Sequence, residues 1–262
     1  MLPRPEHPAD YVAFDAGYVE AGDPIANEKP PASSAMADAL RNTLAAQGYQ
    51  ATAAGPPQIL FVYHWGLLNR DSHAIRNGLS IDPNLHARLA LLTTTRQDGE
   101  IENFLLDHRL MGQTNPAFRT PGFLEFQYRD ILDLTHADSY FVVLSAYDYA
   151  SIGRREARLL WRVKMSTRSA GAAMADALPA LLQGGAPYFG RDLNKLQTVA
   201  APLIAGNRAA PGAQQFSPPS GMVGSLDENF LRELMKREHT EFSGARAGDL
   251  AAYAPRLSAS SL

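Results

Sequence analysis

The 262-residue chain contains no cysteine, and this absence removes several kinds of chemistry at once. Without thiols there is no disulfide, no thiolate zinc site, no iron–sulfur cluster and no thiol nucleophile. The sequence has no apolar run of about 18 residues, so we expect no membrane-spanning helix. The formal net charge is only −3, too weak a field to gather nucleic acid or acidic lipid. We therefore expect no membrane-spanning segment and no specific nucleic-acid partner.

Motifs that carry common catalytic functions are also missing. The chain has no glycine-rich dinucleotide fingerprint, no phosphate-binding loop and no His-Glu-x-x-His pair. The nearest approach to a serine-hydrolase turn is Ser220-Gly221, followed by Gly224-Ser225, and neither follows a predicted strand. We accordingly expect no cofactor and assign no catalytic residue.

What the chain does contain is enough apolar material for a core. Apolar residues make up 45% and charged residues 19%, which is typical of a globular protein. The 20 glycines and 18 prolines indicate long ordered loops. The composition along the chain predicts an α+β domain over residues 1–204 with an insertion at about 66–136, a Pro/Gly-rich connection over 205–224, and a C-terminal helix and tail over 225–262.

Hydrophobic periodicity predicts four strands. A first strand is expected over 11–19, and segments 59–65 and 139–148 are apolar on both faces, as in interior strands. Segment 157–167 alternates between apolar and basic residues, apart from Leu160, which indicates a half-exposed strand. The last two segments form a predicted antiparallel hairpin with its loop near 151–155.

Helical spacing predicts three helices. One covers 33–47, with Ser33 or Ser34 as its cap; another covers 171–182, where Pro179 should kink or restart it. A capping box from Ser225 to Glu228 opens the third, over 225–240, while 85–95 suits either a helix or a strand. The predicted fold is α+β: an antiparallel or mixed sheet with helices packed on one face, plus long loop insertions.

A group of histidines and carboxylates between residues 64 and 108 is one candidate for chemistry. Imidazole titrates near neutral pH and ligates zinc, so such a group suits metal binding or acid–base catalysis. The spacing matches no metal motif, and we favour loop histidines with one hydrogen-bonded histidine in a strand. The metal candidates are His64, Asp71, His73, His86 and His108.

A run of basic residues along the predicted hairpin is the clearest charged feature. Alternation would place several of these side chains on an exposed sheet face, where they suit an anionic partner. Strands also carry basic residues on a solvated face as protection against edge pairing, and that interpretation stays open. The candidates for anion or partner binding are Arg154, Arg155, Arg158, Arg162, Lys164 and Arg168.

Three short segments carry a resemblance to a known family: Ala45-Ala46-Gln47-Gly48-Tyr49 at a helix end, Phe61-Val62-Tyr63 in a strand, and Leu159-Leu160-Trp161-Arg162 in a return strand. The chain resembles bacterial lipoprotein-like envelope domains of unknown function over roughly 11–65 and 139–183. The resemblance implies a small exported α+β domain, often lipid-anchored, with no established catalytic residues. The chain departs from the family in having no lipobox cysteine and a much longer 66–136 interval.

Three functional expectations follow. The first is a non-enzymatic envelope-associated binding or structural protein, and the second is a metal- or acid–base-dependent hydrolase using the 64–108 histidines. The third is a subunit of a larger assembly that docks through its C-terminal segment, so a protein partner or self-association is expected. Met1 to Pro5 do not form a signal peptide, so the chain stays in the cytoplasm or has lost a leader. We expect the envelope or periplasm, with membrane proximity only if that leader carried a lipid anchor.

Overall fold

We analysed a computed structural model, which describes residues 8–26, 28–52, 55–72, 84–92, 137–191 and 227–240, together with 193, 197 and 199. The strands are β1 (Ala9–Ala21), β2 (Tyr49–Ala51), β3 (Ile59–Leu68), β4 (Ser139–Asp148) and β5 (Leu159–Arg168). The helices are α1 (Ser33–Ala46), α3 (Leu85–Leu92), α6 (Tyr149–Ile152), α7 (Met174–Gly185) and α8 (Glu228–Thr240), with a 3-10 turn, η2 (Ala186–Tyr188).

The strands form one mixed sheet in the order β2-β1-β3-β4-β5. β1 is parallel to both β2 and β3, whereas β4 is antiparallel to β3 and β5. All ten residues of β3 and eight of the ten in β4 are buried, as expected for interior strands that are apolar on both faces. The predicted α+β fold with a mixed sheet is confirmed.

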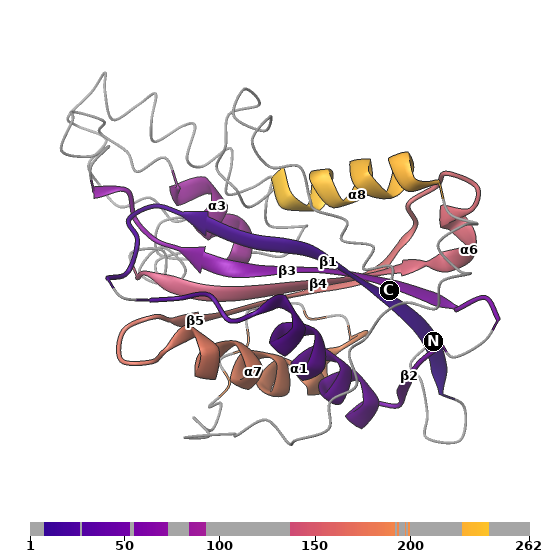
Figure 1. Ribbon diagram of the computed structural model, residues 1–262, viewed down its shortest axis with the longest axis horizontal. Helices are drawn as coiled ribbons and strands as arrows, with labels where there is room; N and C mark the ends of the chain where they lie inside the picture. The colour runs from indigo at the N-terminus through magenta and orange to yellow at the C-terminus, as the bar shows by residue number, and fades with distance from the viewer. Residues whose placement is uncertain are drawn as a thin grey trace.

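Helices cover both faces of the sheet (Figure 1). On one face, Met36 of α1 and Leu178 of α7 share a core with Phe61 of β3. This confirms the predicted packing of these two helices on one side. On the opposite face, Leu234 of α8 packs against Leu60 of β3, and α3 covers the neighbouring part of the same face. The sheet is therefore the middle layer of three.

Two bulges shift the side-chain alternation. In β1 the pairing with β3 slips between Asp15 and Gly17, and the Asp15 carboxylate accepts a hydrogen bond from the Gly17 amide at 2.8 Å. Gly17 has φ +102°, a left-handed conformation that favours glycine. In β5 the slip leaves Leu160 without a partner residue on β4, because Leu159 pairs with Tyr147 and the next paired residue is Trp161. This bulge explains why Leu160 interrupts the sequence alternation.

The helix ends correct three details of the sequence interpretation. The residue before α1 is Ala32, which makes no side-chain cap, and Ser33 is already helical. The carboxylate that caps α8 belongs to Asp227, which accepts from the amides of Asn229 and Phe230 at 3.0 and 3.2 Å. Pro179 does not restart its helix, because it lies inside a continuous α7, and the kink stays a prediction.

Other expectations are settled only in part. Residues 85–92 form a helix, which decides between helix and strand for that part of 85–95, and β3 continues to Leu68 into the expected loop. Most of the 66–136 insertion and all of the 205–224 connection lie outside the described residues. Among the helices that the structure describes, none has the length and apolar character needed to cross a bilayer.

Candidate functional site

A group of polar residues gathers on the sheet face beneath α3 and α8. The strand register aligns Val62, Ser145 and Arg162 across β3, β4 and β5, and aligns His64, Val143 and Lys164 in the next row on that face. Directly opposed side chains on neighbouring strands lie close enough to interact. We call this group the polar cluster; its members are His64, Ser145, Tyr147, Arg162, Lys164 and Glu238.

Glu238 is the centre of the polar cluster. It belongs to α8, its side chain is only 1% exposed, and it lies one turn beyond Leu234 and Met235 on the buried stripe of that helix. Its carboxylate accepts hydrogen bonds from the Ser145 hydroxyl at 2.9 Å and from the Tyr147 hydroxyl. A buried carboxylate is costly unless such donors surround it, so the three groups act as a unit.

Arg162 supplies the opposite charge. Its Nη2 lies 2.5 Å from Glu238 Oε1, and its Nε donates to the Ser145 hydroxyl oxygen at 2.9 Å. The Arg162 side chain is 16% exposed, so water screens this pair only weakly. Removing either partner would leave the other charge in a poorly solvated position without a counter-charge. Such a change should lower the free energy of unfolding strongly.

The pKa of the Tyr147 hydroxyl is shifted by the same environment. Burial raises the pKa of its hydroxyl to about 12, and the Glu238 carboxylate contributes in the same direction. Arg162 opposes the shift because a cation favours the phenolate. The hydroxyl therefore stays protonated and remains a hydrogen-bond donor at neutral pH.

Lys164 and His64 occupy the adjoining row of the polar cluster. The Lys164 ammonium donates to the Ala90 carbonyl oxygen of α3 at 2.6 Å, which ties β5 to that helix. His64 is fully buried on β3 and meets the Phe141 ring edge-to-face, with centroids 5.9 Å apart. The structure thus brings one candidate metal ligand and two candidate anion-binding residues to a single sheet face.

The remaining metal candidates do not join His64 in the part of the chain that is described. Asp71 follows the end of β3, and His86 lies in α3, although its side chain is outside the described set. His73 and His108 lie outside the described residues altogether. Within the described ranges, no group of three or more histidines and carboxylates is placed to hold a metal ion. The hydrolase interpretation stays an untested prediction.

The basic residues of the hairpin divide into two groups. Arg162 and Lys164 face α8 and α3, so this part of the sheet face is covered rather than solvated as expected. Arg154, Arg155 and Arg158 are exposed and form ion pairs with Glu156, Asp227 and Asp148, respectively. Arg168 is exposed at the end of β5. Anion binding by these residues is untested.

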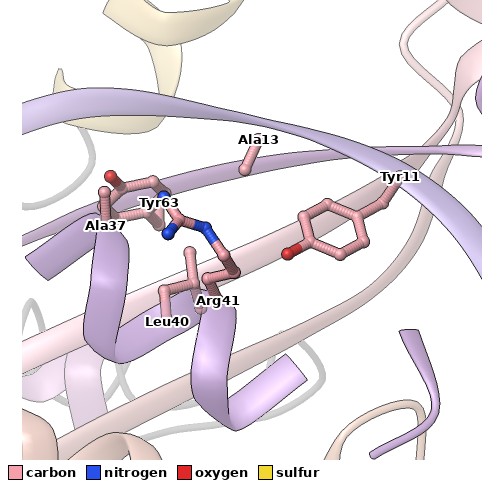
Figure 2. A pocket seen from close by; sticks show the side chains of 6 residues that line it. All are labelled: Tyr11, Ala13, Ala37, Leu40, Arg41 and Tyr63. Carbon is pink, nitrogen blue, oxygen red and sulfur yellow. The ribbon is translucent and has the colours of Figure 1, made fainter. Parts of the chain in front are cut away.

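A small hollow lies on the other side of the sheet, between α1 and strands β1 and β3 (Figure 2). The figure shows the Tyr11 hydroxyl directed toward the Arg41 side chain, which extends from α1. The cavity volume is about 20 Å³, which holds a water molecule but no organic ligand.

Asp15 and Tyr63 lie beside this hollow and have perturbed acidities. Burial raises the pKa of the Asp15 carboxyl, while hydrogen bonds from the Gly17 amide, Ser33 and Tyr63 partly offset the shift. Burial also raises the pKa of Tyr63, and the Asp15 charge adds to that effect. Because Ser33 opens α1, this carboxyl fastens the start of the helix to the β1 bulge.

Sequence interpretation did not identify Ser145 and Glu238, nor the role of the Tyr147 hydroxyl as a hydrogen-bond donor. A usable signal existed on α8, since Glu238 continues the helical stripe of Leu231, Leu234 and Met235 at the same spacing. A carboxylate in an apolar stripe indicates a buried partner of opposite charge. In β4, Ser145 and Tyr147 lie two residues apart on one face of an otherwise apolar strand, but nothing local to β4 indicates α8.

The fold and the polar cluster define an α+β domain whose mixed sheet is closed on one face by a C-terminal helix carrying a buried charge. The chain matches no family model, no curated protein and no solved structure.

Proposed function

We propose that this protein is a binding module that takes an extended segment of a protein partner onto the free edge of β5. The observation that supports the proposal is the open outer edge of that strand. Within the described part of the chain, β5 is the last strand of the sheet and pairs on one side only, with β4. Its ten residues present backbone groups that a partner strand can use.

Exposed apolar side chains at the start of β5 support the proposal. Leu159 and Leu160 are 41% and 43% exposed, and they are two of the three large apolar side chains found exposed among the described residues. The bulge at Leu160 brings both leucines to the surface at the same end of the strand. An apolar pair beside an open strand edge suits side chains of an added strand.

The charges around the edge favour carboxylates in the partner. Arg158 precedes the leucine pair and Arg168 ends the strand, so exposed cations lie at both ends of β5. The Arg158–Asp148 pair is long, at 3.8 Å, and its Arg158 side chain is 69% exposed. Exposed pairs of this kind contribute only about 0–1 kcal/mol, so they do not withhold the arginine from a partner.

Selection from a library of displayed random decapeptides against the full chain tests this function. We expect the selected peptides to be extended and apolar with acidic residues, and to slow hydrogen exchange at the β5 amides. The double variant Leu159→Lys/Leu160→Lys should weaken binding at least tenfold, because it places charge where the apolar contact forms. Val199→Lys, which changes a similarly exposed apolar residue outside β5, should leave binding unchanged.

Peptides that bind the double variant as tightly as the native chain would contradict this function. So would bound peptides that protect amides elsewhere and leave those of β5 unprotected. An envelope location is part of the proposal only through the resemblance to envelope domains. Fractionation of cells that make the full-length protein tests it, and recovery with cytoplasmic markers would favour the alternative location.

A further inference from the structure

We propose that three sheet residues of the polar cluster form a receptor for α8 and can accept this helix from a second copy of the chain. The receptor is the sheet side of the cluster: Ser145, Tyr147 and Arg162. Its occupant is the Glu238 carboxylate, supplied in this structure by the same chain. The inference does not depend on the β5 edge, because the receptor lies on the covered face of the sheet.

The receptor is selective for one type of helix. Its three donors converge on one carboxylate, so the incoming helix must place an acidic residue at that point. The neighbouring surface, which includes Leu60 and Val62, is apolar and takes Leu231, Leu234 and Met235. A helix must therefore carry three apolar residues and one carboxylate at the correct spacing. Every copy of this chain contains such a helix.

A second ion pair marks where the helix begins. Asp227 caps α8 and also pairs with Arg155 of the β4–β5 connection, with Nη2 and Oδ2 2.6 Å apart. The Asp227–Arg155 pair lies at the start of α8 and the Glu238–Arg162 pair near its end, so the two pairs mark the direction of α8 on the sheet. All of these contacts are between α8 and the rest of the fold, so a second copy can make every one of them.

The chain length before α8 is what allows exchange. Phe189 is buried in the core beside Trp161 and Asp227 caps α8, so residues 190–226, 37 in all, connect these two fixed points. Fully extended, a connection of this length could reach about 120 Å, more than the diameter of a small domain. α8 makes the same contacts whether it binds its own chain or a second copy. The equilibrium between these two arrangements therefore depends on the effective concentration of α8 at the receptor of its own chain. That concentration is about millimolar for short flexible linkers and falls with connection length. Copies at a comparable concentration therefore compete for the receptor.

Reciprocal charge variants of the full chain test the exchange. Arg162→Glu and Glu238→Arg each place like charges at the centre of their own receptor. When the two variants are mixed, each helix fits the receptor of the other copy. We expect each variant alone to have the 28.5 kDa mass of one chain and the mixture to form a species of twice that mass. A mixture that contains only single chains would count against the inference.

The double variant Arg162→Glu/Glu238→Arg is the control for folding. Its melting temperature should exceed that of either single variant, because the pair is restored within one chain. If it does, single chains in the mixture mean that the receptor works only within one chain, and the inference is wrong.

A second measurement leaves the receptor residues unchanged. It tests the exchange of α8 between copies even if the charge variants fail to fold. Because the chain has no cysteine, single dye sites can be introduced as Glu233→Cys on α8 and Arg154→Cys on the hairpin. Both side chains are exposed and lie outside the polar cluster. We expect energy transfer between a donor on one copy and an acceptor on another, rising with concentration toward about 1 mM. No transfer over that range would overturn the inference.

The same measurement in the Leu159→Lys/Leu160→Lys background separates exchange from pairing of β5 edges. Transfer that persists in this background supports exchange of α8. Transfer that disappears assigns the association to the β5 edge and overturns the exchange inference while leaving the proposed function intact.

Discussion

At the scale of single residues, the most informative feature is a charged side chain at a buried position where an apolar side chain would need no compensating hydrogen bonds. Glu238 occupies a position that a leucine would fill on an ordinary amphipathic helix. Buried ion pairs contribute less to stability than well-packed apolar groups of similar volume, but they are costly to break. The main effect of the pair with Arg162 is therefore on which helix fits this sheet face. Its effect on how tightly that helix binds is smaller.

Removing that carboxylate should destabilise the fold strongly. Glu238→Ala leaves Arg162 without its buried partner and leaves two hydroxyl donors without their acceptor, so we expect a loss of about 3 kcal/mol in the free energy of unfolding. Glu233→Ala changes an exposed residue of the same helix and should cost far less. Urea unfolding of the three proteins measures the difference, and equal losses for both variants would contradict the role given to the polar cluster.

Asp15 should make stability depend on pH in a defined direction. Its pKa is raised above 3.8 in the folded chain, so the folded state binds the proton more tightly than the unfolded state does. The contribution of Asp15 is therefore greatest at low pH and is lost as the pH rises from about 4 through the raised pKa. In Asp15→Asn, stability relative to the native chain should rise over that window and then level off.

Urea unfolding of both proteins at a series of pH values from about 4 to 7 measures this difference. Other carboxyl groups affect both profiles equally, so the difference between them isolates Asp15. Parallel profiles would show that burial does not shift this group.

At the scale of secondary-structure elements, much of the fold could be predicted because periodicity is a local property. The apolar runs at 59–65 and 139–148 predicted β3 and β4. Helical spacing predicted α1, α7 and α8. Apart from the details at Ser33, Pro179 and Asp227 in the helices, the errors arose where the partner of a residue is distant in sequence. Alternation in β5 correctly separated Arg162 and Lys164 from the apolar side chains, but it could not show that α3 and α8 cover them.

The close approach of β1 and β3 gives a prediction at this scale. A Cβ on Gly66 would lie 1.9 Å from the Val19 carbonyl oxygen, so Gly66→Ala must push two backbones apart. We expect a loss of about 3 kcal/mol, at the upper end of overpacking effects. At Gly153 the nearest atom to an added Cβ is 3.8 Å away, and φ is −60°, so Gly153→Ala should be nearly neutral. Similar urea midpoints for the two variants would contradict this packing.

At the scale of the whole molecule, the central question is whether α8 belongs to the domain that precedes it. A separable C-terminal segment was one of the three interpretations of the sequence, because a Pro/Gly-rich stretch precedes the helix. The buried contacts of α8 with β1, β3 and β4 are those of a core element. A helix that completes a core yet follows a long connection can serve its own chain or a second copy, and both uses require the same contacts.

Removal of α8 should therefore damage the domain. A chain ending at residue 224 loses Leu231, Leu234 and Met235, each contributing about 1.5–3 kcal/mol when buried, out of a typical total of 5–15 kcal/mol. It also leaves Arg162 without Glu238. We expect a much lower melting temperature and binding of a hydrophobic dye to the uncovered sheet face, whereas a chain ending at residue 242, which retains α8, should melt close to the full-length protein. A shortened chain that stays folded, monomeric and free of dye would instead favour a separable docking segment, because the sheet would then be stable without the helix that covers it.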